Sequence, residues 1–195
     1  TGNQADSDGG GMDIASSSPT IENCFFYENN SNDRGGAIYC SANSNPNIIG
    51  SVIENNTARN GGGMAIRFDS QVDIVESVIE NNQAVEQGGG VYVSDNSSIN
   101  FNNSAIVSNS TSQDCFTNQG SQGAGIIVKG SSVVFSNGEI SNNQVADTGG
   151  AIFLSGGSTG EFNSSVFYNN RGAVIGGGAT TAGAGIGAIF DSGAD

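Results

Sequence analysis

Six charged side chains are the residues of this sequence best suited to act together on a substrate. Two carboxylates facing across a cleft are what a glycoside hydrolase requires. Acids that bind calcium, together with an Arg or Lys base, are typical of polysaccharide lyases. The six residues are Arg67, Asp69, Asp73, Glu76, Asp95 and Lys129. They make a polysaccharide lyase or glycoside hydrolase the enzymatic alternative.

The composition argues against catalysis. The chain has no His, which excludes Ser–His and Cys–His nucleophiles and His-based metal sites. It has no Trp and only 4 Tyr to stack on sugar rings. The segment from Asp8 to Asp13 resembles a calcium-binding glycine repeat but does not recur, so Ca²⁺ is a weak candidate. We expect no catalytic residue, no cofactor, no metal site and no enzymatic activity.

The charge balance limits the partners. Acidic residues outnumber basic ones by 19 to 5, for a net charge of -14. Nucleic acid is not expected as a partner, because neutralising phosphates requires clustered Lys and Arg. No apolar run is long enough to cross a bilayer, so we expect no direct membrane insertion.

Three cysteines and six glycosylation sequons could carry modifications. We expect Cys24 and Cys40 to be small core residues, with a disulfide between them left open, and Cys115 to be exposed in a loop. Asn96, at an expected loop, is the candidate glycosylation site. The other sequons begin at Asn29, Asn55, Asn102, Asn109 and Asn163.

The elements that would position these residues follow one repeat. Copies of a hexapeptide such as Ser51–Asn56 begin at residues 24, 51, 77, 104, 138 and 165, in steps of 27, 26, 27, 34 and 27. A glycine-rich motif follows each of the first five copies, as in Gly35–Ile38, and an earlier copy, Gly9–Met12, has its partner before the chain starts. Two motifs that keep one period predict a solenoid.

Columns of equivalent residues indicate which side chains point inward. Apolar residues alternate after the glycines, as in Ile38 and Cys40, and this period of two is typical of strands. Two further columns are apolar in every copy. The first holds Ile21, Ile48, Ile74, Phe101, Phe135 and Phe162, and the second Phe26, Ile53, Ile79, Ile106, Ile140 and Phe167.

A third column is always Asn: Asn29, Asn56, Asn82, Asn109, Asn143 and Asn170. A tight turn leaves backbone groups unpaired next to a narrow core, and a stacked Asn amide can both donate to and accept from them. Asn also tolerates left-handed backbone angles. We interpret this column as a buried structural ladder rather than a row of metal or sugar ligands.

The sequence therefore predicts an all-β fold, a right-handed parallel β-helix of about seven coils of roughly 26 residues. Residues 1–195 form one domain, with an insertion loop at 110–122, and it is expected to be part of a longer solenoid or of an end-to-end assembly. A propeller blade is too long for this period, and the single Leu excludes leucine-rich repeats.

The last coil has two candidate glycine strands, Gly176–Ala179 and Gly183–Ile186. We favour the second, because Ile186 offers the core a large apolar side chain. Residues 171–182 would then form a loop.

Gly-Gly-Ala-Ile at 35–38 and 149–152, with Phe-x-x-Asn at 26–29 and 167–170, resembles the repeat of polymorphic outer-membrane proteins. The resemblance covers residues 9–178. It implies the β-helical passenger of an autotransporter, a surface protein implicated in adhesion.

These observations predict a non-enzymatic, secreted or cell-surface β-helix, serving as an adhesin stalk or as a subunit of an extracellular filament or sheath. Its expected partners are further coils of the same protein, other copies stacked end to end, and host or cell-surface glycans or proteins.

Overall fold

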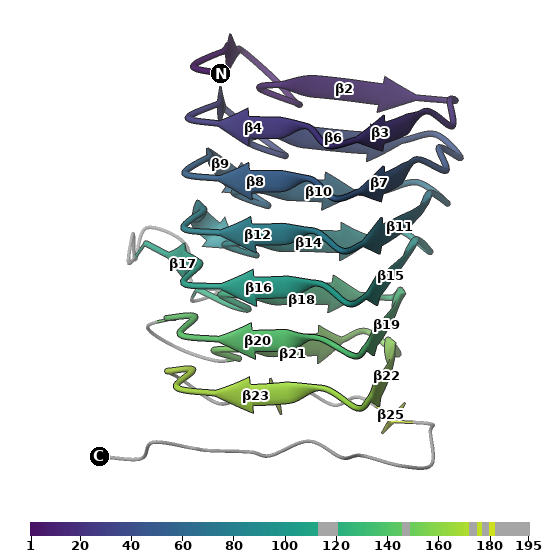
Figure 1. Cartoon of the computed structure of the whole chain (residues 1–195), viewed down its shortest axis with the longest axis vertical. Coiled ribbons are helices and arrows are strands. Elements are labelled where there is room, and N and C mark those ends of the chain that lie inside the picture. The colour runs from purple at the N-terminus through teal and green to yellow at the C-terminus, as the bar shows by residue number, and fades with distance from the viewer. Residues whose placement is uncertain (113–120, 146–148, 172–174, 177–179, 182–195) are drawn as a thin grey trace.

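A computed structural model describes residues 1–112, 121–145, 149–171, 175–176 and 180–181. In this part of the chain every regular element is a β-strand, and the strands wind into a stack of coils (Figure 1). All strand pairs are parallel, and the predicted right-handed parallel β-helix is confirmed.

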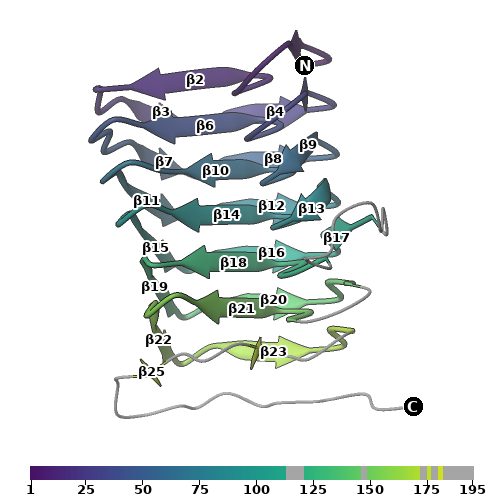
Figure 2. The ribbon, with the colours of Figure 1, turned by 180° about the vertical axis from the view of Figure 1, so that it is seen from behind.

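Successive strands of one coil belong to four different parallel sheets, which we call A to D. Seen from behind in Figure 2, sheet B covers the face opposite to sheet D. Sheet A contains β1 (Gln4–Ala5), β5 (Asn30–Ser31), β9 (Thr57–Asn60), β13 (Gln83–Gln87) and β17 (Ser110–Thr111). Sheet B contains β2 (Met12–Ala15), β6 (Ile38–Ser41), β10 (Met64–Ile66), β14 (Val91–Ser94), β18 (Ile126–Lys129), β21 (Ile152–Ser155) and β24 (Ile175–Gly176). Sheet C contains β3 (Thr20–Glu22), β7 (Asn47–Ile49), β11 (Gln71–Val75), β15 (Ser98–Asn102), β19 (Ser132–Ser136), β22 (Thr159–Asn163) and β25 (Thr180–Thr181). Sheet D contains β4 (Phe25–Tyr27), β8 (Val52–Glu54), β12 (Val78–Glu80), β16 (Ala105–Val107), β20 (Glu139–Ser141) and β23 (Val166–Tyr168).

Identical positions of successive coils pair directly, and this register builds the core. Ile48, Ile74 and Phe101 are adjacent partners in sheet C, and Ile53, Ile79 and Ile106 are adjacent in sheet D. All twelve residues of the two predicted apolar columns are buried. The rings of Phe101 and Phe135 pack against each other in a tilted arrangement inside the core, with centroids 5.1 Å apart.

The Asn column forms a continuous chain of amide hydrogen bonds. Asn56 Nδ2 donates to Asn82 Oδ1 at 2.9 Å, and the Asn56 backbone N–H donates to the same oxygen at 2.9 Å. The second Asn82 amide hydrogen reaches the Ile53 carbonyl at 2.9 Å. The same pattern joins Asn29 to Asn170 without interruption.

The ladder begins one rung earlier than the sequence predicted. Asn3 donates to Asn29 Oδ1 from its side chain at 2.8 Å and from its backbone at 3.2 Å. Gly9 follows Asn3 at the usual interval of six residues. The partner of the first glycine motif is therefore inside the chain, and the expectation that it precedes the chain was wrong.

Two columns of Ser residues stabilise two further corners of the coil. At the corner between sheets C and D, the Ser51 N–H donates to Ser77 Oγ at 3.0 Å. Between sheets B and C, the Ser44 N–H donates to Ser70 Oγ at 3.1 Å, in a column that the sequence analysis did not identify. The second column continues through Ser17, Ser44, Ser70, Ser97, Ser131 and Ser158.

We predicted that Cys24 and Cys40 are both small core residues. This is correct for Cys40 and wrong for Cys24. Cys40 is completely buried between Ile14 and Ile66 of the neighbouring strands. Cys24 occupies the Ser column but is exposed, because β3 and β4 are the terminal strands of their sheets and no coil covers it. Both thiols are free. Cys115 lies outside the described residues.

The insertion and the last coil also differ from expectation. Ser110 and Thr111, placed in the insertion, continue sheet A as β17 by pairing with β13, because they repeat the position of Gln83 and Ala84. In the last coil Ile175 pairs with Ile152, which neither predicted frame contains. A β-branched residue suits a strand better than the Gly- and Ala-rich frames do. Residues 177–179 and 183–186 lie outside the described part.

Candidate functional site

The six charged candidates do not form one cluster. Arg67 and Asp95 meet at the corner where sheet B passes into sheet C. Asp69, at the same corner, instead accepts a hydrogen bond from Asn96 Nδ2 at 2.7 Å. Asp73 lies on the outer face of sheet C, where Asn100 Nδ2 donates to it at 2.7 Å.

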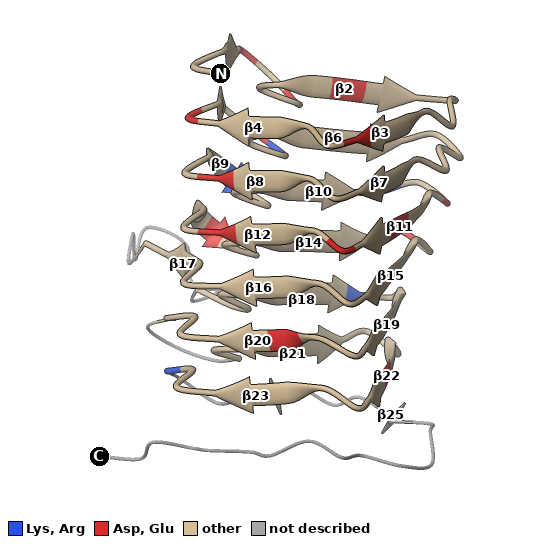
Figure 3. Ribbon diagram, in the orientation of Figure 1, with Lys and Arg blue, Asp and Glu red and all other residues tan. Residues whose placement is uncertain are grey.

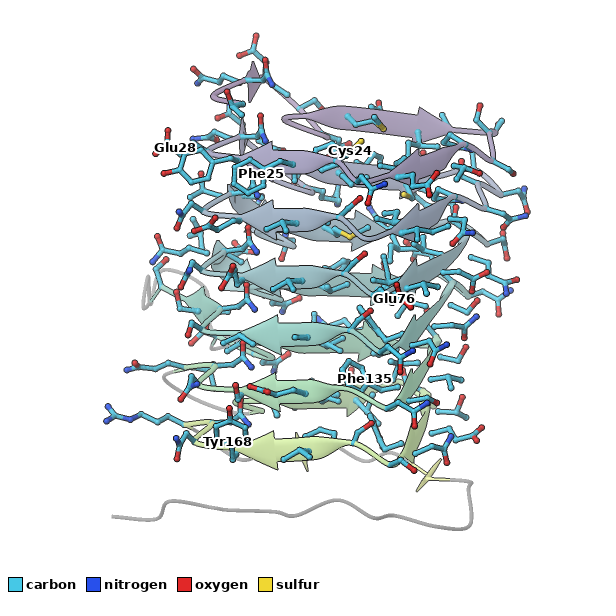
Figure 4. All side chains as sticks on the ribbon, in the orientation of Figure 1. Cys24, Phe25, Glu28, Glu76, Phe135 and Tyr168 are labelled. Carbon is cyan, nitrogen blue, oxygen red and sulfur yellow. The ribbon has the colours of Figure 1, made fainter. Side chains whose placement is uncertain are left out.

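Glu76 is exposed in the turn between sheets C and D, with a φ of 50° (Figure 4). Arg67 and Asp95 thus belong to one surface, while Asp73 and Glu76 belong to others. The four carboxylates are thus spread over the B–C corner, the outer face of sheet C and the turn between sheets C and D.

The Arg67–Asp95 pair is supported by its neighbours. Arg67 Nε lies 2.5 Å from Asp95 Oδ2 and 3.1 Å from Ser94 Oγ. The guanidinium carbon lies 4.4 Å from the centroid of the Phe68 ring. Burial opposes the charge of Arg67, but the hydrogen bond and negative charge of Asp95 outweigh it and raise the pKa of the guanidinium. Arg67 is therefore a fixed cation held against an aromatic ring.

An outward row of mostly aromatic and aliphatic residues crosses sheet B beside this pair. It contains Tyr39, Ala65, Tyr92, Ile127 and Phe153, paired in register. The sequence contains a signal for this row, since Tyr39 stands between two inward residues, Ile38 and Cys40, of an alternating strand.

The turn glycines explain why much of this row is covered. Gly9, Gly35, Gly61, Gly88, Gly123 and Gly149 have φ between 62° and 76°. A Cβ atom added to Gly123 would lie only 2.8 Å from Ile127 Cβ. Glycine is thus required both by the left-handed angle and by the close approach of the turn to the outward row.

Tyr39 is almost completely buried in the outward row of sheet B. It is only 6% exposed. Burial, and after it the negative charge of Asp8, raises the pKa of the Tyr39 phenol, while Arg67 and Arg34 oppose the shift. Its hydroxyl therefore stays protonated at neutral pH, available as a donor among charged groups.

Lys129 lies on the same face as Arg67, two coils further along the stack. Its Nζ donates to Gln87 Oε1 at 2.7 Å. Burial lowers the pKa of Lys129, and the charge of Glu86 opposes the shift. We call Arg34, Tyr39, Arg67, Tyr92 and Lys129 the sheet-B face. It holds three of the five basic residues of the chain, next to both tyrosines of sheet B. Such a surface can bind anionic, ring-shaped groups by charge and stacking.

The Asn residues of the glycosylation sequons differ in their exposure to solvent. Asn96 is exposed in the turn after β14, with a φ of 60°. Asn29 and Asn109 are buried in the ladder, at 1% and 0% exposure, where a glycan has no room. Asn96 is engaged with Asp69, and a glycan at Asn96 would project from the corner beside the sheet-B face.

Sheet A carries a shallow depression, and the described residues contain neither a metal-binding cluster nor a membrane-spanning helix. A depression of about 350 Å³ lies over sheet A, lined mainly by Asn30, Thr57, Arg59 and Val85. Within the described residues, no group of three or more His, Cys, Asp or Glu is arranged to hold a metal ion. The same residues include no helix that is long and apolar enough to span a membrane.

Comparison with known proteins places the chain in a family. The family model described as right-handed beta helix region matches residues 1–135. No curated protein and no solved structure gives a significant match. The matched region contains the ladder from Asn3 to Asn109 and all residues of the sheet-B face. The chain belongs to the right-handed β-helix family.

Proposed function

We propose that the chain is a non-enzymatic β-helical rod of an extracellular surface, acting as an adhesin stalk or as a subunit of a filament or sheath. The observation that carries the proposal is the unbroken chain of amide hydrogen bonds from Asn3 to Asn170. It couples each coil to the next from Asn3 to Asn170 and makes these coils stack as one stiff unit. The resemblance to polymorphic outer-membrane protein repeats supports the adhesive role.

The sheet-B face is the proposed adhesive surface. Arg67 is held by Asp95 and packed on Phe68, so its exposed edge needs little reordering on binding. Tyr92 and Lys129 add a ring and a second cation on neighbouring coils. These groups suit an acidic glycan, whose carboxylates meet the cations while its rings stack on Tyr.

Polygalacturonate is the probe for this surface. We expect the purified protein to bind it without releasing new reducing ends or unsaturated products. Arg67→Ala should weaken binding about tenfold, which corresponds to the loss of one partly buried charged contact. Arg59→Ala is the matched control, because Arg59 forms a similar pair with Glu86 on sheet A. Equal losses in both variants would rule out the sheet-B face.

The second candidate function is a polysaccharide lyase or hydrolase. The observation that favours it is the presence of Arg67, Asp95 and Lys129 on one face. Cleavage of polygalacturonate that Asp95→Asn abolishes and Asp73→Asn leaves intact would replace the adhesive proposal by this one. Negative-stain microscopy then separates stalk from filament, since only a filament subunit grows into long fibres as the concentration rises.

A further inference from the structure

The outer face of sheet D carries an apolar stripe that is partly open to solvent. Phe25, Val52, Val78 and Ala105 are the first residues of consecutive strands and pair in register. With roughly 4.8 Å between strands, the stripe is about 14 Å long. Phe25 is 53% exposed and projects toward the viewer in Figure 4, and the other three are partly exposed.

Acidic side chains border this stripe. Glu54 and Glu80 end β8 and β12 on the same outward side as the Val residues. Glu28 and Glu76 lie in the turns at the two ends of the strands and are exposed. Figure 3 shows these strand ends in red. Glu54 and Glu80 are direct partners across the ladder, so that two like charges face each other, which destabilises a sheet.

The basic residues of the chain lie elsewhere. No Lys or Arg is on a strand of sheet D; the five are Arg34, Arg59, Arg67, Lys129 and Arg171. The ion pairs of the described residues join three of them to Asp8, Asp33, Glu86 and Asp95, none of which is on sheet D. Within the described residues, the acids around the stripe therefore form no ion pair with a Lys or Arg of their own chain.

The acidic residues around the stripe indicate which kind of partner can bind over it. A second copy docked face to face would bring the same uncompensated acids against Glu54 and Glu80, and like charges opposed in an interface disfavour that pairing. A segment with an apolar side flanked by Lys or Arg would bury Phe25 and Val78 and also neutralise the acids. The complementary occupant is basic and amphipathic.

We propose that the outer face of sheet D is the docking site for a basic amphipathic α-helix of another protein. A helix rises about 5.4 Å per turn, close to the roughly 4.8 Å between coils, so residues i, i+4, i+7 and i+11 can follow the four side chains of the stripe. An extended segment along the rod repeats its side chains about every 6.7 Å and loses this match.

A labelled 15-residue peptide of Leu and Lys, with Leu at i, i+4, i+7 and i+11, is the probe, and fluorescence anisotropy measures its dissociation constant. We expect Val52→Ser/Val78→Ser and Glu54→Gln/Glu80→Gln each to weaken binding about tenfold. The matched control is Asp73→Asn/Glu161→Gln, which removes two exposed charges from sheet C and should change affinity less than twofold. Melting curves establish that all three variants are folded.

Three results would overturn the proposal. Equal weakening by the sheet C control, or equal affinity for a peptide of the same composition in scrambled order, would show attraction to net charge alone. Self-association of the free protein that disappears in Val52→Ser/Val78→Ser would make a second copy the occupant. Raising the salt concentration should weaken the helical peptide but leave residual binding through the apolar stripe.

Discussion

Adjacent Asn residues have different roles at the turn after sheet D. In the pairs Asn55-Asn56, Asn81-Asn82, Asn142-Asn143 and Asn169-Asn170, the first residue has a positive φ and the second is a ladder rung. We expected the left-handed backbone angle at the ladder Asn, but the preceding Asn adopts it. One Asn tolerates the turn conformation and the other satisfies the buried backbone groups.

Asn82→Leu should destabilise the protein severely. The change removes bonds to Asn109, to the Ile53 carbonyl and from Asn56, at about 1–3 kcal/mol for each buried group left unpaired. Urea denaturation measures the free energy of unfolding. Asn100→Leu is the control, since Asn100 is on the outer face of sheet C and should change stability only slightly. Similar losses in the two variants would contradict the ladder.

Cys40 makes stability depend on alkaline pH. Burial, and then the charge of Asp13, raises the pKa of the Cys40 thiol far above its usual value. The unfolded chain therefore loses this proton at lower pH than the folded chain does, and stability falls as the pH rises above about 8.5, by up to about 1.4 kcal/mol per pH unit.

The measurement is a series of melting curves between pH 7 and 10. Cys40→Val fills the same column, as Val93 does in sheet B, and should lose less stability over this range than the original chain. Parallel pH profiles for the two proteins would show that Cys40 does not contribute.

At the scale of the element, one turn departs from its repeat for a steric reason. Gly138 replaces the Ser of the column between sheets C and D. A Cβ atom there would lie 2.7 Å from the Phe135 ring, and its distance to the Ser104 carbonyl oxygen would also be far below van der Waals contact. The β19–β20 turn thus lies too close to Phe135 and to the previous coil for a side chain.

Gly138→Ala should therefore destabilise the protein by about 1–3 kcal/mol, the usual cost of overpacking. This holds although most other coils have Ser at the same position. The reverse change, Ser77→Gly, should cost stability through the lost bond to the Ser51 N–H. Thermal unfolding checks both, and a neutral or stabilising Gly138→Ala would show that the turn can relax.

For the whole molecule, stability is a sum of contacts between neighbouring coils. β12 is bonded on both sides, by β8 and β16, whereas β4 is the terminal strand of sheet D. Hydrogen exchange followed by mass spectrometry should therefore find slower exchange at Val78–Glu80 than at Phe25–Tyr27. Equal protection of the two strands would indicate that the coils open together as one cooperative unit.

The sequence by itself determined the coil. The period, the two apolar columns and the Asn column are local regularities, and each residue type suits its place whichever coil it belongs to. Ile79 must be inward because its strand alternates, and Asn82 must be buried because its turn leaves polar groups to satisfy. These assignments follow from the repeat alone and do not depend on which residues the neighbouring coils contain.

At positions where the residue changes from coil to coil, only the tertiary structure decided which contacts are made. The repeat places Arg67 one coil away from Asp95, but only the structure shows that the two side chains form an ion pair supported by Ser94. Cys24 is exposed because its sheet ends there, although its column is buried elsewhere. Ile175, a β-branched residue that suits a strand, pairs with Ile152 in sheet B although neither glycine frame contains it. Outward side chains acquire their neighbours only through stacking, and the charges and tyrosines of the proposed surfaces are all outward.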